Sequence, residues 1–378
     1  MKNEEYRHIA KLFLNPYLVI VIMKKRKVCI RLTFLYAVIV LYTINELIQR
    51  YSFHLSVSES VDLVYLWVNG SDPNWIKKYN LAKNYTRVNY SEVNYYRRYI
   101  EKNELLLSLR TVFQFLPWIN KIYIVTNDQY PYWLNRTHPK ISIVTHSQLF
   151  GEGKTSFSSN SIQFTINKIP NLANRFILAD DDFFWTEPID KSYYFTKNKL
   201  KFRVSSYRGD VYEEFGPDAT CTDDEDNYLV FRKSILKAWE LVKSKRKKIK
   251  NPKFGYSHVA IPLTKNIFEE IFQEYNVSHM KDIQFRSCGM VQFQSLFLYH
   301  AYATGRLKKA YRNFYTTFRG DCTAQVNYIL AHKSKGASYC FNNCMAQFFQ
   351  QLIDFYPPCD YELDFDIKNS LYNKKNNK

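Results

Sequence analysis

Residues 175–182 read RFILADDD, an apolar run of strand length that ends in three consecutive aspartates. The run predicts a buried strand at residues 175–179. Three carboxylates directly after a buried strand repel one another unless a cation or a proton intervenes. Because Mg²⁺ and Mn²⁺ prefer hard oxygen ligands, Asp180, Asp181 and Asp182 are candidate metal ligands. A turn in which an aspartate caps a helix is the alternative.

Strands and helices alternate on the N-terminal side of this run. Apolar residues at spacings of three and four predict a helix from Asn103 to Leu116, and a second helix is predicted at residues 159–169. Such alternation predicts right-handed crossovers and a mostly parallel sheet, which is an α/β fold. Further strands are predicted at 61–68 (VDLVYLWV), 121–126 (KIYIVT) and 141–145 (ISIVT), and further helices at 267–275 and 291–302.

Polar residues follow three of the predicted strands, at 69–72, 127–128 and 180–182. In open α/β sheets ligands bind outside the carboxyl ends of the strands, so these positions indicate a site. An acidic loop after a strand is typical of a nucleotide-sugar site of the glycosyltransferase-A type. The chain contains neither a G-x-G-x-x-G sequence nor a P-loop, which disfavours a dinucleotide cofactor and a P-loop kinase.

The composition limits the classes of protein that fit the chain. Of its 378 residues 46% are hydrophobic, which excludes wholesale disorder. The mean hydropathy of −0.38 excludes a polytopic membrane protein. The 53 Lys and Arg against 35 Asp and Glu give a net charge of +18, which is typical of a solvated surface in a lysine-rich chain and also fits an acidic partner. Nucleic acid is disfavoured, because the sequence has no zinc-finger spacing and no RNP-type motif.

The N-terminus predicts a membrane anchor. Residues 24–27 read KKRK and precede the apolar stretch 28–44, which predicts a transmembrane signal anchor at 28–48. A cytosolic basic arm (1–27) would precede it and a stem (49–60) would follow. The chain would then be a single-pass type II membrane protein with its catalytic domain in the lumen of the Golgi or ER. A cleaved signal peptide is the alternative.

Six cysteines follow the expected anchor. An even number in a lumenal setting permits disulfides, but the pairing cannot be read from the sequence. N-glycosylation sequons begin at Asn69, Asn84, Asn89, Asn135 and Asn276 and fit a lumenal glycoprotein. The six cysteines are Cys221, Cys288, Cys322, Cys340, Cys344 and Cys359.

Four regions of the chain resemble the Stealth proteins. The first covers residues 62–75 (DLVYLWVNGSDPNW), and the second runs from Asn103 to the three aspartates. The third is looser and includes His258 and Phe285-Arg286. The fourth is similar at residues 340–343 and 355–362. This family includes bacterial capsule sugar-phosphate transferases and the Golgi enzyme that puts N-acetylglucosamine-1-phosphate on lysosomal glycoproteins.

The resemblance implies the transfer of a sugar-1-phosphate. A hydroxyl of a glycan or polysaccharide acceptor would attack the phosphorus next to the sugar of a UDP-sugar, and UMP would leave. The fold would be Rossmann-like or glycosyltransferase-A-like, with Mg²⁺ or Mn²⁺ as cofactor. One Stealth-like domain would cover residues 61–365, with 190–251 as an insertion or lid, and residues 366–378 would form a disordered basic tail. A homodimer is a further expectation.

The resemblance also assigns roles to individual residues. His258 would be the base that takes the hydroxyl proton, and Arg286 would grip phosphate. Glu104 and Asp72 would orient the acceptor, the base or the metal. Helix-related roles for Glu104 and Asn103, and a structural role for His258, are the alternatives. The expected substrate-binding residues are Asn69, Asn103, Arg110, Asn127, Asn342 and Asn343.

Several positions depart from the family pattern. Asp180 stands where asparagine is usual, Gln163 where glutamate is usual, and Asn343 where aspartate is usual. Gln284 likewise replaces an arginine. These departures keep two other functions open. One is an ordinary metal-dependent glycosyltransferase that releases UDP, and the other is a non-catalytic anchored binding protein on the same fold.

Overall fold

The computed structural model describes residues 39–44, 59–86, 99–222, 227–311, 315–320, 322–332, 338–344 and 346–362. The chain divides into two units, Met1–Ser58 and Glu59–Lys378. In the first unit only residues 39–44 are described, and they form a short helix. The second unit contains the α/β body and all the elements named below.

The expectation of a single-pass type II membrane protein needs correction. Among the described residues, no helix combines the length and the apolar character needed to cross a membrane. Most of the expected anchor at 28–48 lies outside the described residues, as do the arm, most of the stem and the basic tail.

A five-stranded sheet forms the centre of the second unit, in the order β3-β2-β1-β4-β8. The first four strands are parallel and β8 is antiparallel to β4. The sheet is thus mostly parallel, which confirms the predicted α/β class. The strands are β1 (Val61–Leu66), β2 (Ile122–Thr126), β3 (Ile141–Thr145), β4 (Arg175–Asp180) and β8 (Ile261–Thr264).

Helices connect and cover these strands. Between β1 and β2 the chain forms α4 (Pro73–Thr86) and α6 (Glu104–Phe115). Between β3 and β4 it forms α7 (His146–Phe150), α8 (Ser159–Gln163) and the 3₁₀ turn η1 (Ile166–Lys168). The single helix predicted at 159–169 is therefore divided. The Thr165 hydroxyl donates to the Ile162 carbonyl (2.8 Å). Such a side-chain hydrogen bond competes with the backbone hydrogen bonds of a continuous helix.

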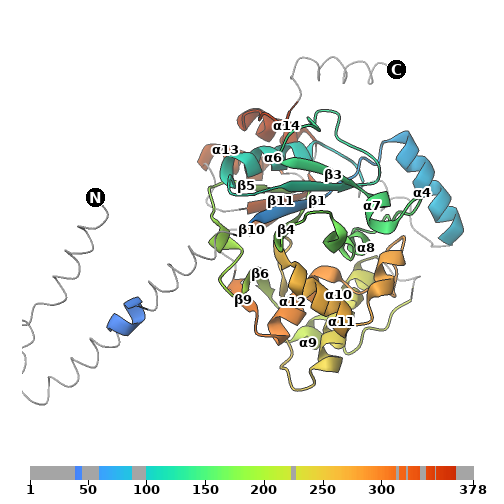
Figure 1. Cartoon of the computed structure of the whole chain (residues 1–378), viewed down its shortest axis with the longest axis vertical. Coiled ribbons are helices and arrows are strands. Elements are labelled where there is room, and N and C mark those ends of the chain that lie inside the picture. The colour runs from blue at the N-terminus through green and yellow to red at the C-terminus, as the bar shows by residue number, and fades with distance from the viewer. Residues whose placement is uncertain are drawn as a thin grey trace, which may run out of the picture. The chain divides into compact units, whose positions relative to one another are not determined.

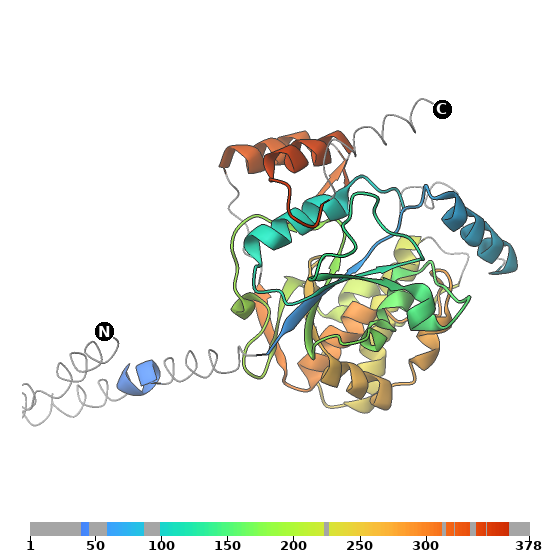
Figure 2. The same ribbon diagram turned by 45° about the horizontal axis from the view of Figure 1, so that its top comes forward.

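The two faces of the central sheet carry different helices (Figures 1 and 2). On one side lie α6, α13 (Thr323–His332) and α14 (Ala346–Phe355). On the other lie α10 (Asn227–Lys245), α11 (Lys265–Glu274) and α12 (Phe293–Ala303), which confirms the helices predicted near 267–275 and 291–302. The short α9 (Val211–Phe215) and the turns η2 (Lys191–Tyr193) and η3 (Ser278–Asp282) complete the helical elements of the described chain.

Two three-stranded sheets extend the body. One has the order β10-β11-β5 and the other β7-β6-β9. β6 and α10 come from the expected insertion at 190–251, and Trp239 of α10 is fully buried, so this segment contributes to the core. The strands are β5 (Phe183–Trp185), β6 (Leu200–Ser206), β7 (Phe254–Tyr256), β9 (Leu307–Tyr311), β10 (Tyr315–Gly320) and β11 (Ser338–Cys344).

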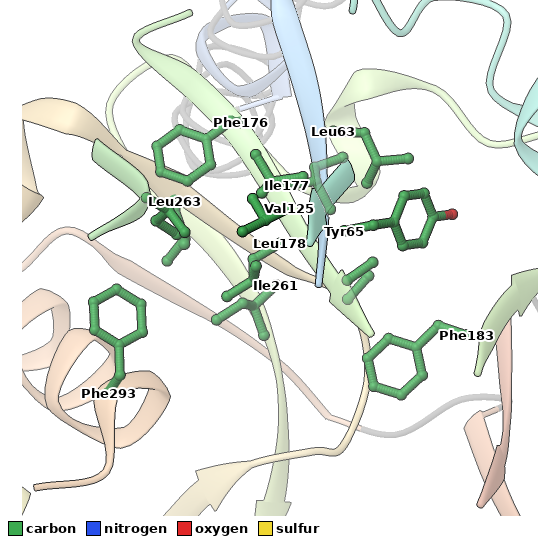
Figure 3. Packing of buried hydrophobic residues seen from close by; sticks show 14 of the residues in the cluster. Leu63, Tyr65, Val125, Phe176, Ile177, Leu178, Phe183, Ile261, Leu263 and Phe293 are labelled. Atoms are coloured by element: carbon green, nitrogen blue, oxygen red, sulfur yellow. The ribbon is translucent and has the colours of Figure 1, made fainter. Parts of the chain in front are cut away.

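One apolar core lies along the central sheet (Figure 3). Leu63, Ile177 and Leu263 are each fully buried, and burying one such side chain contributes about 1.5–3 kcal/mol. Tyr65 bonds through its hydroxyl to Ser108 Oγ of α6 (2.6 Å), and Ser108 Oγ donates to the Phe183 carbonyl. These hydrogen bonds fix α6 and β5 against β1, one residue before β1 ends at Leu66.

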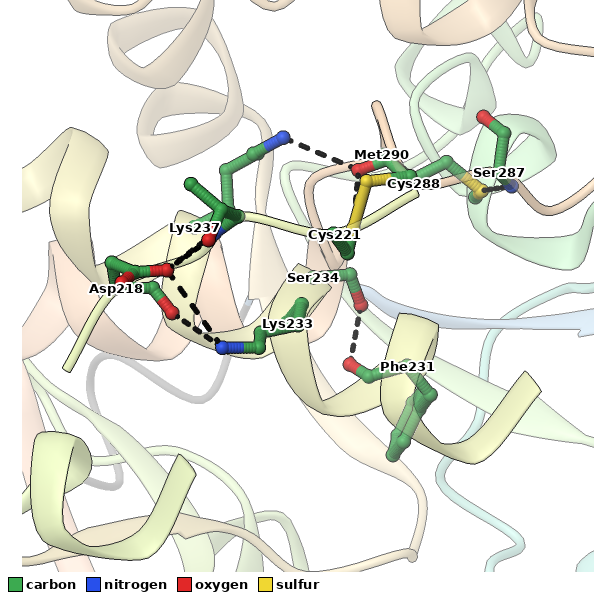
Figure 4. Close-up of a disulfide and its surroundings, with 10 residues drawn as sticks. Asp218, Cys221, Phe231, Lys233, Ser234, Lys237, Ser287, Cys288 and Met290 are labelled. Carbon is green, nitrogen blue, oxygen red and sulfur yellow. Dashed lines mark hydrogen bonds and ion pairs between the residues drawn. A yellow bond between two sulfur atoms is a disulfide. The ribbon is translucent and has the colours of Figure 1, made fainter. Parts of the chain in front are cut away.

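A disulfide joins Cys221 to Cys288 (Figure 4). Lys237 Nζ donates to the Cys288 carbonyl (3.2 Å), so α10 supports the same loop. Arg286 lies two residues before Cys288, which the disulfide holds in place. Cys322 is also disulfide-bonded, whereas Cys340 and Cys359 form no disulfide.

Candidate active site

Five carboxylates gather beyond the carboxyl ends of β1 and β4. Because Leu66 pairs with Asp180 in the parallel register, the three aspartates leave the sheet beside the end of β1. Glu104 begins α6, and Glu101 lies in the loop before it. Backbone amides hold both glutamates, since Asn103 N donates to Glu101 (2.8 Å) and Lys102 N to Glu104 (2.6 Å).

Crowding and burial raise the pKa values of these acids. Burial, together with the charge of Glu104, raises the pKa of Glu101 to about 8. Burial also raises the pKa of Glu104 to about 7 and that of Asp180 to about 6. The pKa of Asp181 is raised well above its ordinary value by burial and by the other acids. In the absence of a cation, the cluster would thus retain protons near neutral pH.

The carboxylate oxygens of this cluster fit a divalent cation. Asp182 Oδ1 is buried, and no described residue gives it a hydrogen bond. An unpartnered carboxylate oxygen is costly unless something binds it. Clustered carboxylate oxygens are the ligands that Mg²⁺ and Mn²⁺ prefer.

A second cluster of possible metal ligands consists of two glutamates and a histidine. Glu270, Glu274 and His300 have ligand atoms within 4.8 Å of one another. Arg306 donates to Glu270 (2.7 Å), and Arg246 donates to Glu274 (2.8 Å). These hydrogen bonds lower the pKa of each glutamate, because the arginines already supply the positive charge. This group is therefore an ion-pair network and a poor candidate for the metal.

His258 lies beside the acid cluster, in the loop between β7 and β8. Because β8 runs antiparallel to β4 and pairs Ile261 with Leu178, the residues before β8 lie at the carboxyl end of β4. His258 Nε2 is 3.7 Å from Asp180 Oδ2, and the imidazole is 40% exposed. Its ring packs nearly at a right angle to the Phe183 ring, with 5.0 Å between the centroids. The ring is thus held in place and remains open to a substrate.

Arg286 is held near the same aspartate. Its positive charge lowers the pKa of Asp180, which partly offsets the effect of burial. The preceding Phe285 is buried in a small aromatic cluster and stacks on Phe157 at 5.3 Å between centroids. Phe157 N also donates to the Gln284 carbonyl (2.8 Å). These contacts fix the backbone from which the guanidinium extends.

The polar residues after β1 mainly shape the backbone there. Asn69 Oδ1 accepts from Ser71 N (2.9 Å), and Asp72 Oδ1 accepts from Trp75 N (3.0 Å) at the start of α4. Gly70 N donates to the Tyr99 carbonyl (2.7 Å). A Cβ at Gly70 would lie 2.5 Å from Tyr99 Cβ, so this position requires glycine.

The other expected substrate-binding asparagines differ in their surroundings. Asn127 follows β2 and is 2% exposed, and its Nδ2 has no hydrogen-bond partner in the described part of the chain. Asn103 takes a left-handed backbone conformation (φ 66°), and its side chain makes no cap bond to α6. Asn342 and Asn343 lie on β11, and their side chains are outside the described atoms.

Arg110 lies in a structural ion pair. Its Nε and Nη2 each donate to Glu362 at 2.7 Å, and its Nη1 donates to the carbonyls of Ile353 and Tyr356. Both side chains are 2% exposed. All three guanidinium nitrogens thus bind the C-terminal segment, and we leave Arg110 out of the proposed site.

Replacing Glu362 with glutamine is expected to lower the free energy of unfolding by about 3–5 kcal/mol, because a buried guanidinium loses its counter-charge. Urea unfolding measures the loss. Asp360→Asn, at a side chain that is 77% exposed, is the control. An unchanged unfolding midpoint together with weaker UDP-sugar binding would indicate that Arg110 belongs to the substrate-binding site.

The sequence did not predict two members of this region. Glu101 lies three residues before Glu104, and this acidic spacing was the available signal. Cys340 begins the Stealth-like stretch at 340–343, but its place near the acids depends on the pairing of β11 with β5, where Cys340 lies opposite Phe183.

The mostly parallel sheet, with an acid cluster beyond its strand ends, is typical of an α/β enzyme and makes that edge the candidate active site. Models of Stealth protein conserved region 1 and conserved region 2 match residues 59–87 and 98–203. The capsular polysaccharide phosphotransferase fcs1 of Haemophilus influenzae is 30% identical over 298 residues, 75% of this chain and 78% of that protein. The chain belongs to the Stealth family.

Other similarities are more distant. The exopolysaccharide phosphotransferase SCO6023 of Streptomyces coelicolor is 27% identical over 76% of this chain, which spans about half (47%) of that relative. The solved galactosyltransferase LgtC is 9% identical, with a TM-score of 0.39 over 79% of this chain and 97% of its own, too distant to inform the site. The named relatives make this chain a transferase of phosphorus-containing groups. The expected homodimer stays a prediction.

Proposed function

We propose that this chain transfers a sugar-1-phosphate from a UDP-sugar to a hydroxyl of a glycan or polysaccharide acceptor and releases UMP. Relatives named capsular and exopolysaccharide phosphotransferases support the reaction class. The observation that carries the proposal is the partly exposed His258, whose Nε2 lies 3.7 Å from Asp180 at the edge of the acid cluster. A base beside a cation site is what attack of a hydroxyl on the diphosphate of a UDP-sugar requires.

The acidic residues would hold Mg²⁺ or Mn²⁺. Asp182, through its unpartnered Oδ1, and Asp181 are the first candidates, with Asp180 and Glu104 beside them. Such an ion neutralises the charge of the donor's diphosphate. Arg286 would add a second positive charge on the phosphate, where a guanidinium can donate two hydrogen bonds.

His258 would move the proton. Its Nε2 takes the proton of the acceptor hydroxyl as the oxygen bonds to the phosphorus next to the sugar. The bond from that phosphorus to the oxygen of UMP breaks, and UMP leaves with the electron pair. The Asp180 carboxylate would then stabilise the imidazolium at 3.7 Å. Asn69, Asp72, Asn103 and Asn127 would line the donor side, beyond the ends of β1 and β2.

A nucleotide-release assay tests the proposal. The full chain is incubated with a panel of UDP-sugars, Mg²⁺ or Mn²⁺ and sugar acceptors, and UMP is separated from UDP by chromatography. Metal-dependent UMP is the expected product. UDP in its place would indicate ordinary glycosyl transfer. Donor binding without either product would favour a binding protein.

A further inference from the structure

Tyr79 of α4 lies at the centre of the small aromatic cluster beside the candidate site. Its ring meets those of Phe157 and Phe285 nearly at right angles, with 5.1 Å and 5.3 Å between the centroids. It also stacks on Trp75 at 5.3 Å and contacts Tyr99 at 5.9 Å. Tyr79 is 3% exposed, although α4 lies at the periphery of the second unit (Figures 1 and 2). A residue of this outer helix is thus buried among rings from three other segments.

The cluster joins segments that lead into the proposed site. Phe285 directly precedes Arg286. The Tyr99 carbonyl accepts from Gly70 N in the loop after β1 (2.7 Å), and the Tyr99 hydroxyl donates to the Phe157 carbonyl (2.6 Å). The backbone on the donor side of the proposed site therefore packs around this cluster.

Arg286 depends on such support because its side chain is long. An arginine has several rotatable bonds, so its guanidinium keeps a fixed place only where neighbouring groups restrict it. On the C-terminal side of Arg286, the chain is held by the disulfide of Cys288 and by Lys237, which donates to the Cys288 carbonyl (3.2 Å). On the N-terminal side, Phe285 is buried in the aromatic cluster. The aromatic contacts of Phe285 thus complete the support of the backbone at Arg286.

We propose that Tyr79 is a positioning residue that fixes Arg286 through Phe285. Removing the central ring would leave a cavity beside Phe285, and a ring that has lost this support can shift together with the backbone of Arg286. A shift of about 1 Å in a binding group can lower a rate about 100-fold. The placement of Arg286 rests on these packing contacts, whereas its grip on the donor phosphate rests on the proposed function.

Nitrogen NMR of the arginine side chains in the full chain tests the placement without a ligand. Arg286→Lys removes the Arg286 Nε–H signal and so identifies it. In Tyr79→Ala this signal is expected to shift and its order parameter to fall, whereas Tyr79→Phe should keep both because the ring remains. Tyr79→Leu, which keeps more of the buried volume, should show the same change to a smaller extent. Leu81→Ala, at a side chain of the same helix that is 51% exposed, is the control.

An Arg286 signal that is unchanged in both Tyr79→Ala and Tyr79→Leu would overturn the proposal. An equal change in Leu81→Ala would overturn it as well, because the effect would then belong to the helix as a whole and not to the buried ring.

The kinetic consequence is measured separately. The kcat/KM for the UDP-sugar should fall about 10–100-fold in Tyr79→Ala and stay near the wild-type value in Tyr79→Phe. In an Arg286→Ala background, Tyr79→Ala should cause little further loss, because the group that it positions is gone. A full additional loss would overturn the role through Arg286. If wild-type protein releases no UMP, the proposed function fails, and the NMR result still decides the placement of Arg286.

Discussion

Replacing His258 with alanine is expected to lower the rate of UMP release by about 10²–10⁴-fold, the usual contribution of a positioned general base. The residue is expected to act on the proton of the acceptor, so the affinity for the UDP-sugar should change little. His258 is 40% exposed, so its loss should also cost little stability. UMP release under saturating donor and acceptor measures the rate, and calorimetry measures donor binding.

His279→Ala is the matched control for this experiment, because His279 is exposed and lies on η3, and its rate should equal that of wild type. Wild-type turnover in His258→Ala would remove the base from the proposed mechanism. A loss of turnover with an equal loss of thermal stability would mean that His258 acts through packing.

Replacing Asp182 with asparagine is expected to lower metal-dependent turnover by about 100-fold or more, as for other groups that stabilise charge in the transition state. The change keeps the shape of the side chain and removes the charge that would hold the ion. Asp354→Asn, at an exposed position of α14, is the control and should leave turnover unchanged.

The same cluster predicts how stability depends on pH. The pKa values of Glu101, Glu104 and Asp180 are raised to about 8, 7 and 6, mainly by burial. The folded state therefore binds more protons than the unfolded state between about pH 4 and pH 8. The stability of the metal-free protein should fall as the pH rises through this window, and Mg²⁺ or Mn²⁺ should restore it at pH 8.

Thermal unfolding at pH 5 and pH 8, with and without metal, measures this effect. A stabilisation of 1 kcal/mol corresponds to about 2–4 °C in a domain of 150–250 residues, so a shift of several degrees is readily seen. A metal effect that is equally large in Asp182→Asn would place the ion elsewhere.

The sequence predicted the central sheet well, because its strands are short apolar runs that end in polar residues. The strand predicted at 141–145 has the observed bounds. Helix α4 was missed, because lysine and asparagine recur along it, and Trp75 and Tyr79 are the only buried residues among those of the helix whose burial is described.

Within the site, local sequence predicted the acid loop but could not separate site residues from structural ones. Arg110 has the chemistry expected of a phosphate ligand, yet its counter-charge lies 252 residues away at Glu362. No local pattern could reveal that pair, and the family resemblance does not distinguish a buried ion pair from a substrate contact.

The pairing of β5 with β11 also affects how the enzyme matures during its synthesis. The three aspartates, His258 and Arg286 all leave the ribosome before Ser338, the first residue of β11. Because domains fold while the chain emerges, the central sheet can form around an incomplete site. Contacts between segments so far apart in sequence form slowly, so Cys340 should reach Asp182 late. A chain truncated before β11 would therefore keep the central sheet and the proposed base, but lack the thiol that contacts both Asp182 and His258.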